Sequence, residues 1–188
     1  MLGIDFLSTW FLIRISGFLA FFWFTFSIAA GLMGQISLCK PNKPLINELH
    51  KKSGWLGFLT TLFHMFLLLV DPYITYHIFE LFIPFQTEYE PIYSALGTLS
   101  FYLAISTIFT SDFLIKKLGR KIWKKVHLLV LPAWLLMLLH GIFIGTDTVQ
   151  PLIASFYGGS TILILFLGFF RYLEGHLKTK APMKKRQI

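Results

Sequence analysis

Apolar residues in this chain gather in five long stretches separated by short polar connections. The stretches cover residues 6–33, 54–70, 92–109, 126–145 and 151–170. An α-helix rises 1.5 Å per residue, so about 20 apolar residues cross the roughly 30 Å hydrocarbon core of a bilayer. The pattern predicts an all-α integral membrane protein with a bundle of five transmembrane helices. The connection 71–90 also contains apolar residues, which predicts an interfacial helix at that end of the bundle.

The composition agrees with a membrane location. The chain is 55% hydrophobic and 18% aromatic, and only 14% of its residues are charged, so it is more apolar than an average soluble domain. Its formal charge of +8 is typical of nucleic-acid-binding proteins, but here the position of the charges has a simpler explanation in membrane topology. We therefore expect a multi-pass protein of the cell membrane with no nucleic-acid partner.

Charged residues are sorted by connection. The basic residues cluster before the second stretch, before the fourth stretch and after the fifth: Lys40, Lys43, Lys51, Lys52; Lys116, Lys117, Arg120, Lys121, Lys124, Lys125; and Arg171, Lys178, Lys180, Lys184, Lys185, Arg186. The connections 71–90 and 145–150 contain acidic residues and neither Lys nor Arg. Because cytoplasmic connections collect Lys and Arg, the N-terminus is predicted outside and the C-terminus inside. Residues 1–175 then form the membrane domain, and residues 176–188 form a basic cytoplasmic tail.

Four histidines fall at two matched depths of the predicted bundle. The second and fourth helices run in the same direction, from inside to outside. His50 and His127 lie at their inner ends, beside lysines. His64 follows His50 by 14 residues and His140 follows His127 by 13, which raises them by about 21 and 20 Å. The spacing predicts an inner pair, His50 with His127, and an outer pair, His64 with His140.

Two histidines that face each other can supply both axial ligands of a haem iron, so two levels predict two b-type haems. Gly54 and Gly57 share a helical stripe with His50 and His64 and would let the flat macrocycles approach. The alternative role for these glycines is close packing of helices. A different class of protein, a haem-free proton-coupled transporter, would use the histidines as a proton relay.

The fourth helix fits the two-level arrangement less simply. Thirteen residues leave His127 and His140 about 140° out of phase on a regular helix. A kink at Pro132 or an irregular first turn at His127 would correct this difference. We therefore expect the helix to be broken between the two histidines.

Arg14 is the one basic residue inside a predicted span. It lies about 12 Å inward from the start of the first stretch, near the level of the outer histidine pair. A buried charge needs a partner, and the propionate of the outer haem is a suitable anion for a guanidinium. The alternative is that Arg14 extends to the outer membrane surface.

These residues resemble the ferric reductase-like transmembrane domain, which ferric reductases, NADPH oxidases and the haem subunit of a bacterial methionine sulfoxide reductase share. The resemblance rests on Arg14 with Gly17, on His50 and His64 with Gly54, on TSDFLIKKLGRKIWKKVH at 110–127, and on LLHG at 138–141. It implies transmembrane electron transfer through two b-type haems, ligated by His50 with His127 inside and by His64 with His140 outside. The sulfoxide reductase subunit lacks the first histidine, so His50 favours the two-haem branch.

The resemblance also implies partners. The larger reductases carry a flavin and nicotinamide domain after the last helix, whereas only about 17 residues follow Arg171 here. We therefore expect an oxidoreductase subunit that receives electrons from a separate donor: a flavoprotein, free flavin or a quinol. The outer acceptor would be ferric iron, oxygen or a partner protein. A structural anchor subunit is a further alternative to the electron-transfer role.

Overall fold

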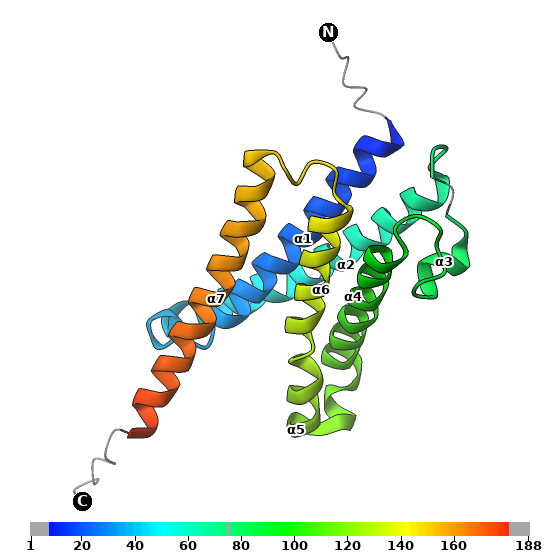
Figure 1. Cartoon of the computed structure of the whole chain (residues 1–188). Helices are drawn as coiled ribbons and strands as arrows, with labels where there is room; N and C mark the ends of the chain where they lie inside the picture. The colour runs from blue at the N-terminus through cyan, green and yellow to red at the C-terminus, as the bar shows by residue number, and fades with distance from the viewer. Residues whose placement is uncertain (1–7, 75, 181–188) are drawn as a thin grey trace, which may run out of the picture.

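The computed structural model describes residues 8–74 and 76–180, and every regular element in this part of the chain is helical. The elements are α1 (Thr9–Met33), the 3-10 helix η1 (Ser37–Asn42), α2 (Lys43–Val70), α3 (Ile78–Phe82), α4 (Pro91–Phe109), the π-helical turn η2 (Thr110–Leu114), α5 (Ile115–His127), α6 (Val130–Ile144) and α7 (Pro151–Lys180). Figure 1 shows α1 beginning at one end of the molecule and α7 ending at the other. The all-α membrane architecture expected from the sequence is confirmed.

The five expected spans fall on four helical stretches of the structure. Four helical stretches are long and apolar enough to cross a membrane: Thr9–Met33, Ser37–Val70, Pro91–Ile144 and Pro151–Lys178. The third of these contains both the third and the fourth expected spans. It is interrupted at Gly119, whose φ of 72° and ψ of 159° are not helical; glycine adopts positive φ with little cost. The chain reverses around this glycine, and α4 packs beside α6 (Figure 1). Five separate crossings and the orientation of the termini stay predictions.

Local sequence explains where the helices begin. The Ser8 hydroxyl accepts a hydrogen bond from the Phe11 backbone N–H at 3.3 Å and caps α1. Prolines stand in the first turns of α2 and α4. The backbone N–H groups of a first turn have no partner within the helix, so proline, which lacks this N–H, costs no hydrogen bond there. Because α2 begins at Lys43, well before the apolar stretch at 54–70, His50 lies inside a regular helix rather than at its edge.

The connection between α2 and α4, which we call the cap, packs along the side of α4, where the Thr98 hydroxyl donates a hydrogen bond to the Leu81 carbonyl oxygen at 3.2 Å. Among the described residues of the cap, Ile78–Phe82 forms the helix α3, and Phe79 is 72% exposed, as expected of a short helix at a membrane interface. Asp71 is buried and accepts hydrogen bonds from the Thr9 hydroxyl at 2.7 Å and the Ile74 N–H at 2.9 Å. The cap is therefore tied to the start of α1. Burial of Tyr76 raises the pKa of its phenol.

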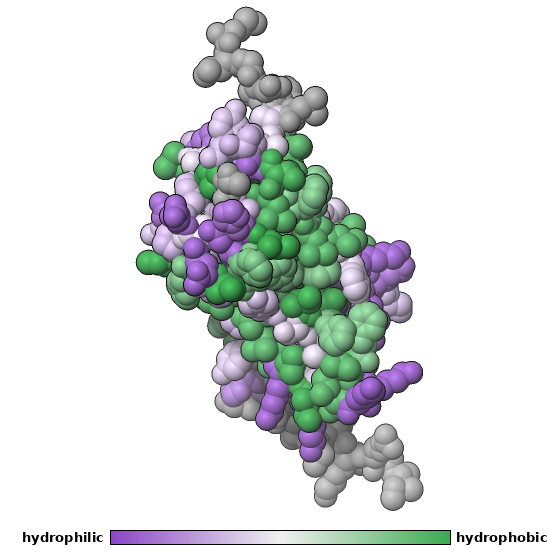
Figure 2. All heavy atoms as spheres, turned by 90° about the vertical axis from the view of Figure 1, so that its right-hand side faces the viewer, coloured by the Kyte–Doolittle hydropathy of each residue, from purple (hydrophilic) through white to green (hydrophobic). Residues whose placement is uncertain are grey.

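Aromatic side chains fill the core between α1, α6 and α7. Phe21 is 2% exposed; its ring centroid lies 5.7 Å from that of Trp134 and 5.1 Å from that of Tyr157. The outward faces of the helices are also apolar: Phe166 and Leu165 of α7 are more than half exposed. Figure 2 shows apolar side chains over the middle of one face, with hydrophilic residues gathered mainly toward its ends. Such a surface is typical of contact with lipid, whereas in water exposed apolar side chains favour aggregation.

One buried polar contact inside the bundle gives a test of this packing. The indole N–H of Trp134 donates to the Thr25 hydroxyl at 2.8 Å. Thr25→Val leaves that N–H buried without a partner, so we expect a loss of about 1–3 kcal/mol in stability. Thermal unfolding in detergent measures it, with Thr60→Val as the control, because the Thr60 hydroxyl only bonds the Leu56 carbonyl of its own helix. Equal unfolding temperatures for the two variants would show that the contact contributes nothing.

Candidate functional site: two levels of paired histidines

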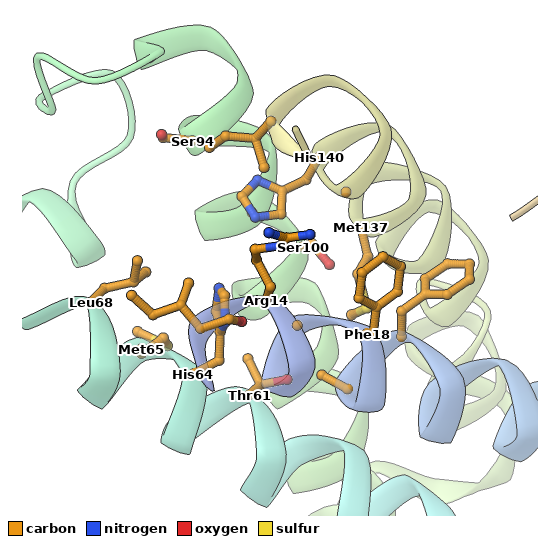
Figure 3. A pocket seen from close by; sticks show the side chains of 18 of the residues that line it. Arg14, Phe18, Thr61, His64, Met65, Leu68, Ser94, Ser100, Met137 and His140 are labelled. Atoms are coloured by element: carbon orange, nitrogen blue, oxygen red, sulfur yellow. The ribbon is translucent and has the colours of Figure 1, made fainter. Parts of the chain in front are cut away.

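The structure brings the four histidines together in two pairs. His50 of α2 and His127 of α5 lie with ring centroids 5.8 Å apart. His64 of α2 and His140 of α6 both line a cavity of about 200 Å³. Figure 3 shows these two side chains directed into the same space. The pairs are those expected from depth along the second and fourth predicted spans.

The expected break between His127 and His140 is present, but it precedes Pro132. α5 ends at His127 and α6 begins at Val130. Between them, the Leu129 N–H bonds the Val126 carbonyl at 3.0 Å, in a tighter turn than an α-helix makes. Pro132 has no N–H to offer the carbonyl four residues earlier, which favours the break at this point. The two histidines are therefore carried on separate helices.

Three of the four rings are held by backbone carbonyl oxygens. Nδ1 lies 2.9 Å from the Ile13 oxygen in His64, 2.8 Å from the Ser27 oxygen in His50 and 2.7 Å from the Tyr93 oxygen in His140. A carbonyl oxygen can only accept, so each Nδ1 carries the hydrogen and donates it. In the neutral ring, Nε2 then keeps a free lone pair. This is the usual arrangement of a histidine that binds a metal.

The spacing of His50 and His127 fits two axial ligands of one haem iron. Imidazole nitrogens bind metals at about 2 Å, so two rings on opposite sides of one metal have centroids about 6 Å apart; the 5.8 Å between His50 and His127 agrees. The part of the chain that the structure describes contains no group of three or more His, Cys, Asp or Glu that could hold a metal ion. Haem iron needs only the two axial ligands from the protein.

Glycines on neighbouring helices make room for three of the rings. A Cβ at Gly17 would lie 3.4 Å from the His64 ring, one at Gly31 would lie 3.1 Å from the His50 ring, and one at Gly97 would lie 2.8 Å from the His140 ring. Each glycine stands four residues after the carbonyl that holds the same ring. The spacing of 14 residues from Gly17 to Gly31 equals that from His50 to His64. That match was a usable signal in the sequence; nothing comparable identified Gly97.

Gly54 and Gly57 of α2 lie against α1 in the structure. A Cβ at Gly54 would lie 3.3 Å from the Ser27 hydroxyl, and one at Gly57 would lie 3.1 Å from the Phe24 ring. Both glycines therefore face α1. Their contacts favour the alternative, close packing of helices, over contact with a macrocycle.

Arg14 lines the outer cavity together with His64 and His140 (Figure 3). It forms an ion pair with Asp147, a residue of the connection between α6 and α7. The side chains of Arg14 and Asp147 are 34% and 16% exposed, so neither simply extends into solvent. No feature of the sequence indicated that Arg14 pairs with a residue so far along the chain. A propionate partner for Arg14 stays a prediction.

One of three comparisons with known proteins found a match. The family model described as Ferric reductase like transmembrane component matches residues 16–138. The match contains His50, His64 and His127, while Arg14 and His140 lie just outside it. Searches of curated proteins and of solved structures found no match. The family model covers well over half of the chain, and this protein therefore belongs to the ferric reductase-like transmembrane family.

Proposed function

We propose that this protein is a membrane cytochrome b that carries electrons from a donor on the cytoplasmic side to an acceptor outside, through two b-type haems. The observation that carries the proposal is the pairing of four histidines at two levels, with Nδ1 of three of them committed to carbonyl oxygens. Membership of the ferric reductase-like family supports transmembrane electron transfer.

The residues of the two sites would have separate roles. His50 and His127 would hold the inner haem, and His64 and His140 the outer haem. The carbonyl oxygens of Ile13, Ser27 and Tyr93 fix the orientation of three of the rings. Haem, when bound, supplies a one-electron carrier, and the protein sets its position and potential.

We infer that the chain crosses the membrane five times. In this arrangement α4 and α6 are two separate spans, and the reversal at Gly119 lies on the cytoplasmic side. The cations around that turn, Lys116, Lys117, Arg120 and Lys121, are exposed, as the positive-inside rule requires. The start of α1 and the end of α7 at opposite ends of the molecule fit an odd number of crossings (Figure 1).

Electron transfer across a sealed membrane tests this function. The purified protein is reconstituted into liposomes that contain a reductant, and a ferric chelate is added outside. We expect reduction of the external iron that depends on the protein and is absent from empty liposomes. A haem-loaded protein that leaves the external chelate oxidised would instead favour a structural anchor.

Arg14 gives a quantitative prediction for the outer site. Two unit charges about 10 Å apart at an effective dielectric constant of about 20 interact by about 1.7 kcal/mol, or roughly 70 mV for a one-electron couple. A positive charge favours the reduced iron, so Arg14→Gln should lower the outer potential by some tens of millivolts. Redox titration measures the shift, with the exposed Lys116→Gln as control. An unchanged potential would place Arg14 away from the haem.

A further inference from the structure

The fourth histidine is held differently from the other three. Nδ1 of His127 lies 3.1 Å from the hydroxyl of Ser111, in the π-helical turn η2. The same hydroxyl lies 2.7 Å from the Thr107 carbonyl oxygen and 3.0 Å from the Trp123 indole nitrogen. The Trp123 ring also stacks on His127, with centroids 5.2 Å apart and planes at 28°.

We propose that Ser111 and Trp123 are positioning residues that hold His127 in the tautomer with hydrogen on Nδ1, which leaves Nε2 free to bind metal. A hydroxyl has one hydrogen to donate and two lone pairs. The Thr107 carbonyl can only accept, at the shortest of the three distances, so it receives the Ser111 hydrogen. The indole N–H can only donate. The remaining lone pair of Ser111 then accepts a hydrogen from His127.

The spacing of these residues along the chain matches the spacing of the residues that contact His140. On α4, Tyr93 supplies the carbonyl for His140, and Gly97, four residues later, leaves room for its ring. Fourteen residues further along the chain stand Thr107 and Ser111. Ser111 therefore occupies the place of the glycine, and its hydroxyl stands between the Thr107 carbonyl and the ring of His127. His127 is held through a hydroxyl, whereas each of the other three rings bonds a carbonyl oxygen directly, with a serine hydroxyl also in contact with His50 and His64.

The neighbouring residue anchors this turn to the opposite wall of the inner site. The Asp112 carboxylate accepts a hydrogen bond from the Trp55 indole N–H at 2.6 Å. Trp55 lies on α2, five residues after His50. The π-helical turn thus contacts both α5 and α2, the two helices that carry His50 and His127. π-helical turns occur often at functional sites.

The inference rests on the proposed function only for the identity of the metal, so its first test needs no haem. The haem-free protein, labelled with ¹⁵N-histidine, is studied by NMR in detergent at pH 8, where an ordinary imidazole is neutral. His127→Ala identifies the His127 signal. We expect hydrogen on Nδ1 in the wild type and in Ser111→Thr, and loss of this preference in Ser111→Ala. Hydrogen on Nε2 in the wild type would overturn the proposal.

Haem titration provides the second readout. Loss of a partner that orients a metal-bound histidine costs about ten- to a hundredfold in affinity, so we expect that loss at the inner site of Ser111→Ala and recovery in Ser111→Thr. Ser106→Ala is the matched control: its exposed hydroxyl also bonds the carbonyl four residues earlier, at 2.7 Å. Equal inner affinity in the two alanine variants would refute a positioning role. A wild type that binds no haem would refute the proposed function, while the NMR result still decides the tautomer.

Discussion

Alanine at His64 or His140 should remove the outer haem and leave most of the inner haem in place. Both rings face the same cavity, and each is oriented by its own carbonyl oxygen, Ile13 for His64 and Tyr93 for His140. Removal of either ring leaves an axial position without its ligand. Because His50 and His127 lie at the other level, their site keeps both ligands. We expect about half of the wild-type haem per chain in either variant.

Haem content per chain and low-temperature difference spectra measure this outcome. His50→Ala should give the reverse pattern, with the outer haem retained. His77→Ala is a suitable control, since His77 is exposed in the cap. Retention of both haems in His50→Ala would show that the inner half of the two-level arrangement is wrong.

Gly97→Ala should also weaken the outer site, although Gly97 is itself no ligand. A Cβ there would lie 2.8 Å from Cε1 and 2.9 Å from Nδ1 of His140, closer than such atoms approach without a shift. The ring cannot give way and also keep its 2.7 Å bond to the Tyr93 oxygen. Overpacking of this kind costs about 1–3 kcal/mol, which corresponds to roughly a ten- to hundredfold weaker site.

Gly158→Ala is the matched control for that substitution. A Cβ at Gly158 meets no atom within 4 Å, and alanine favours a helix over glycine by about 0.5–1 kcal/mol. We expect the control to bind both haems and to be at least as stable as the wild type. If Gly97→Ala and Gly158→Ala bind the outer haem with equal affinity, close packing of the His140 ring against α4 does not contribute to haem binding.

The sequence predicted which histidines lie together, because helical rise separates His50 from His64 along α2 and His127 from His140 along the chain that follows. His50 and His64 lie on one long helix, and the arithmetic of rise places them at two levels. The break before α6 was also expected from the phase difference between His127 and His140. Its position, before Pro132, follows from backbone hydrogen bonding that an apolar pattern does not reveal.

The environment of the histidines was less predictable. Gly54 and Gly57 share a face with the histidines of their own helix, but the glycines that contact the rings belong to neighbouring helices. Which helix stands opposite a ring depends on tertiary packing. The pairing of Arg14 with Asp147 likewise joins a residue of α1 to a residue of the connection between α6 and α7, and it cannot be read from either segment alone. The polar connection after residue 109 did separate the third and fourth expected spans, and in the structure the chain reverses there, at Gly119.

Haem content of the purified wild-type protein tests the central claim most directly. The protein is expressed with adequate haem, purified in detergent, and studied by a reduced-minus-oxidised spectrum together with haem quantification against protein concentration. We expect b-type bands and two haems per chain. A spectrum without b-type bands would contradict the claim and favour a haem-free transporter in which the histidines relay protons.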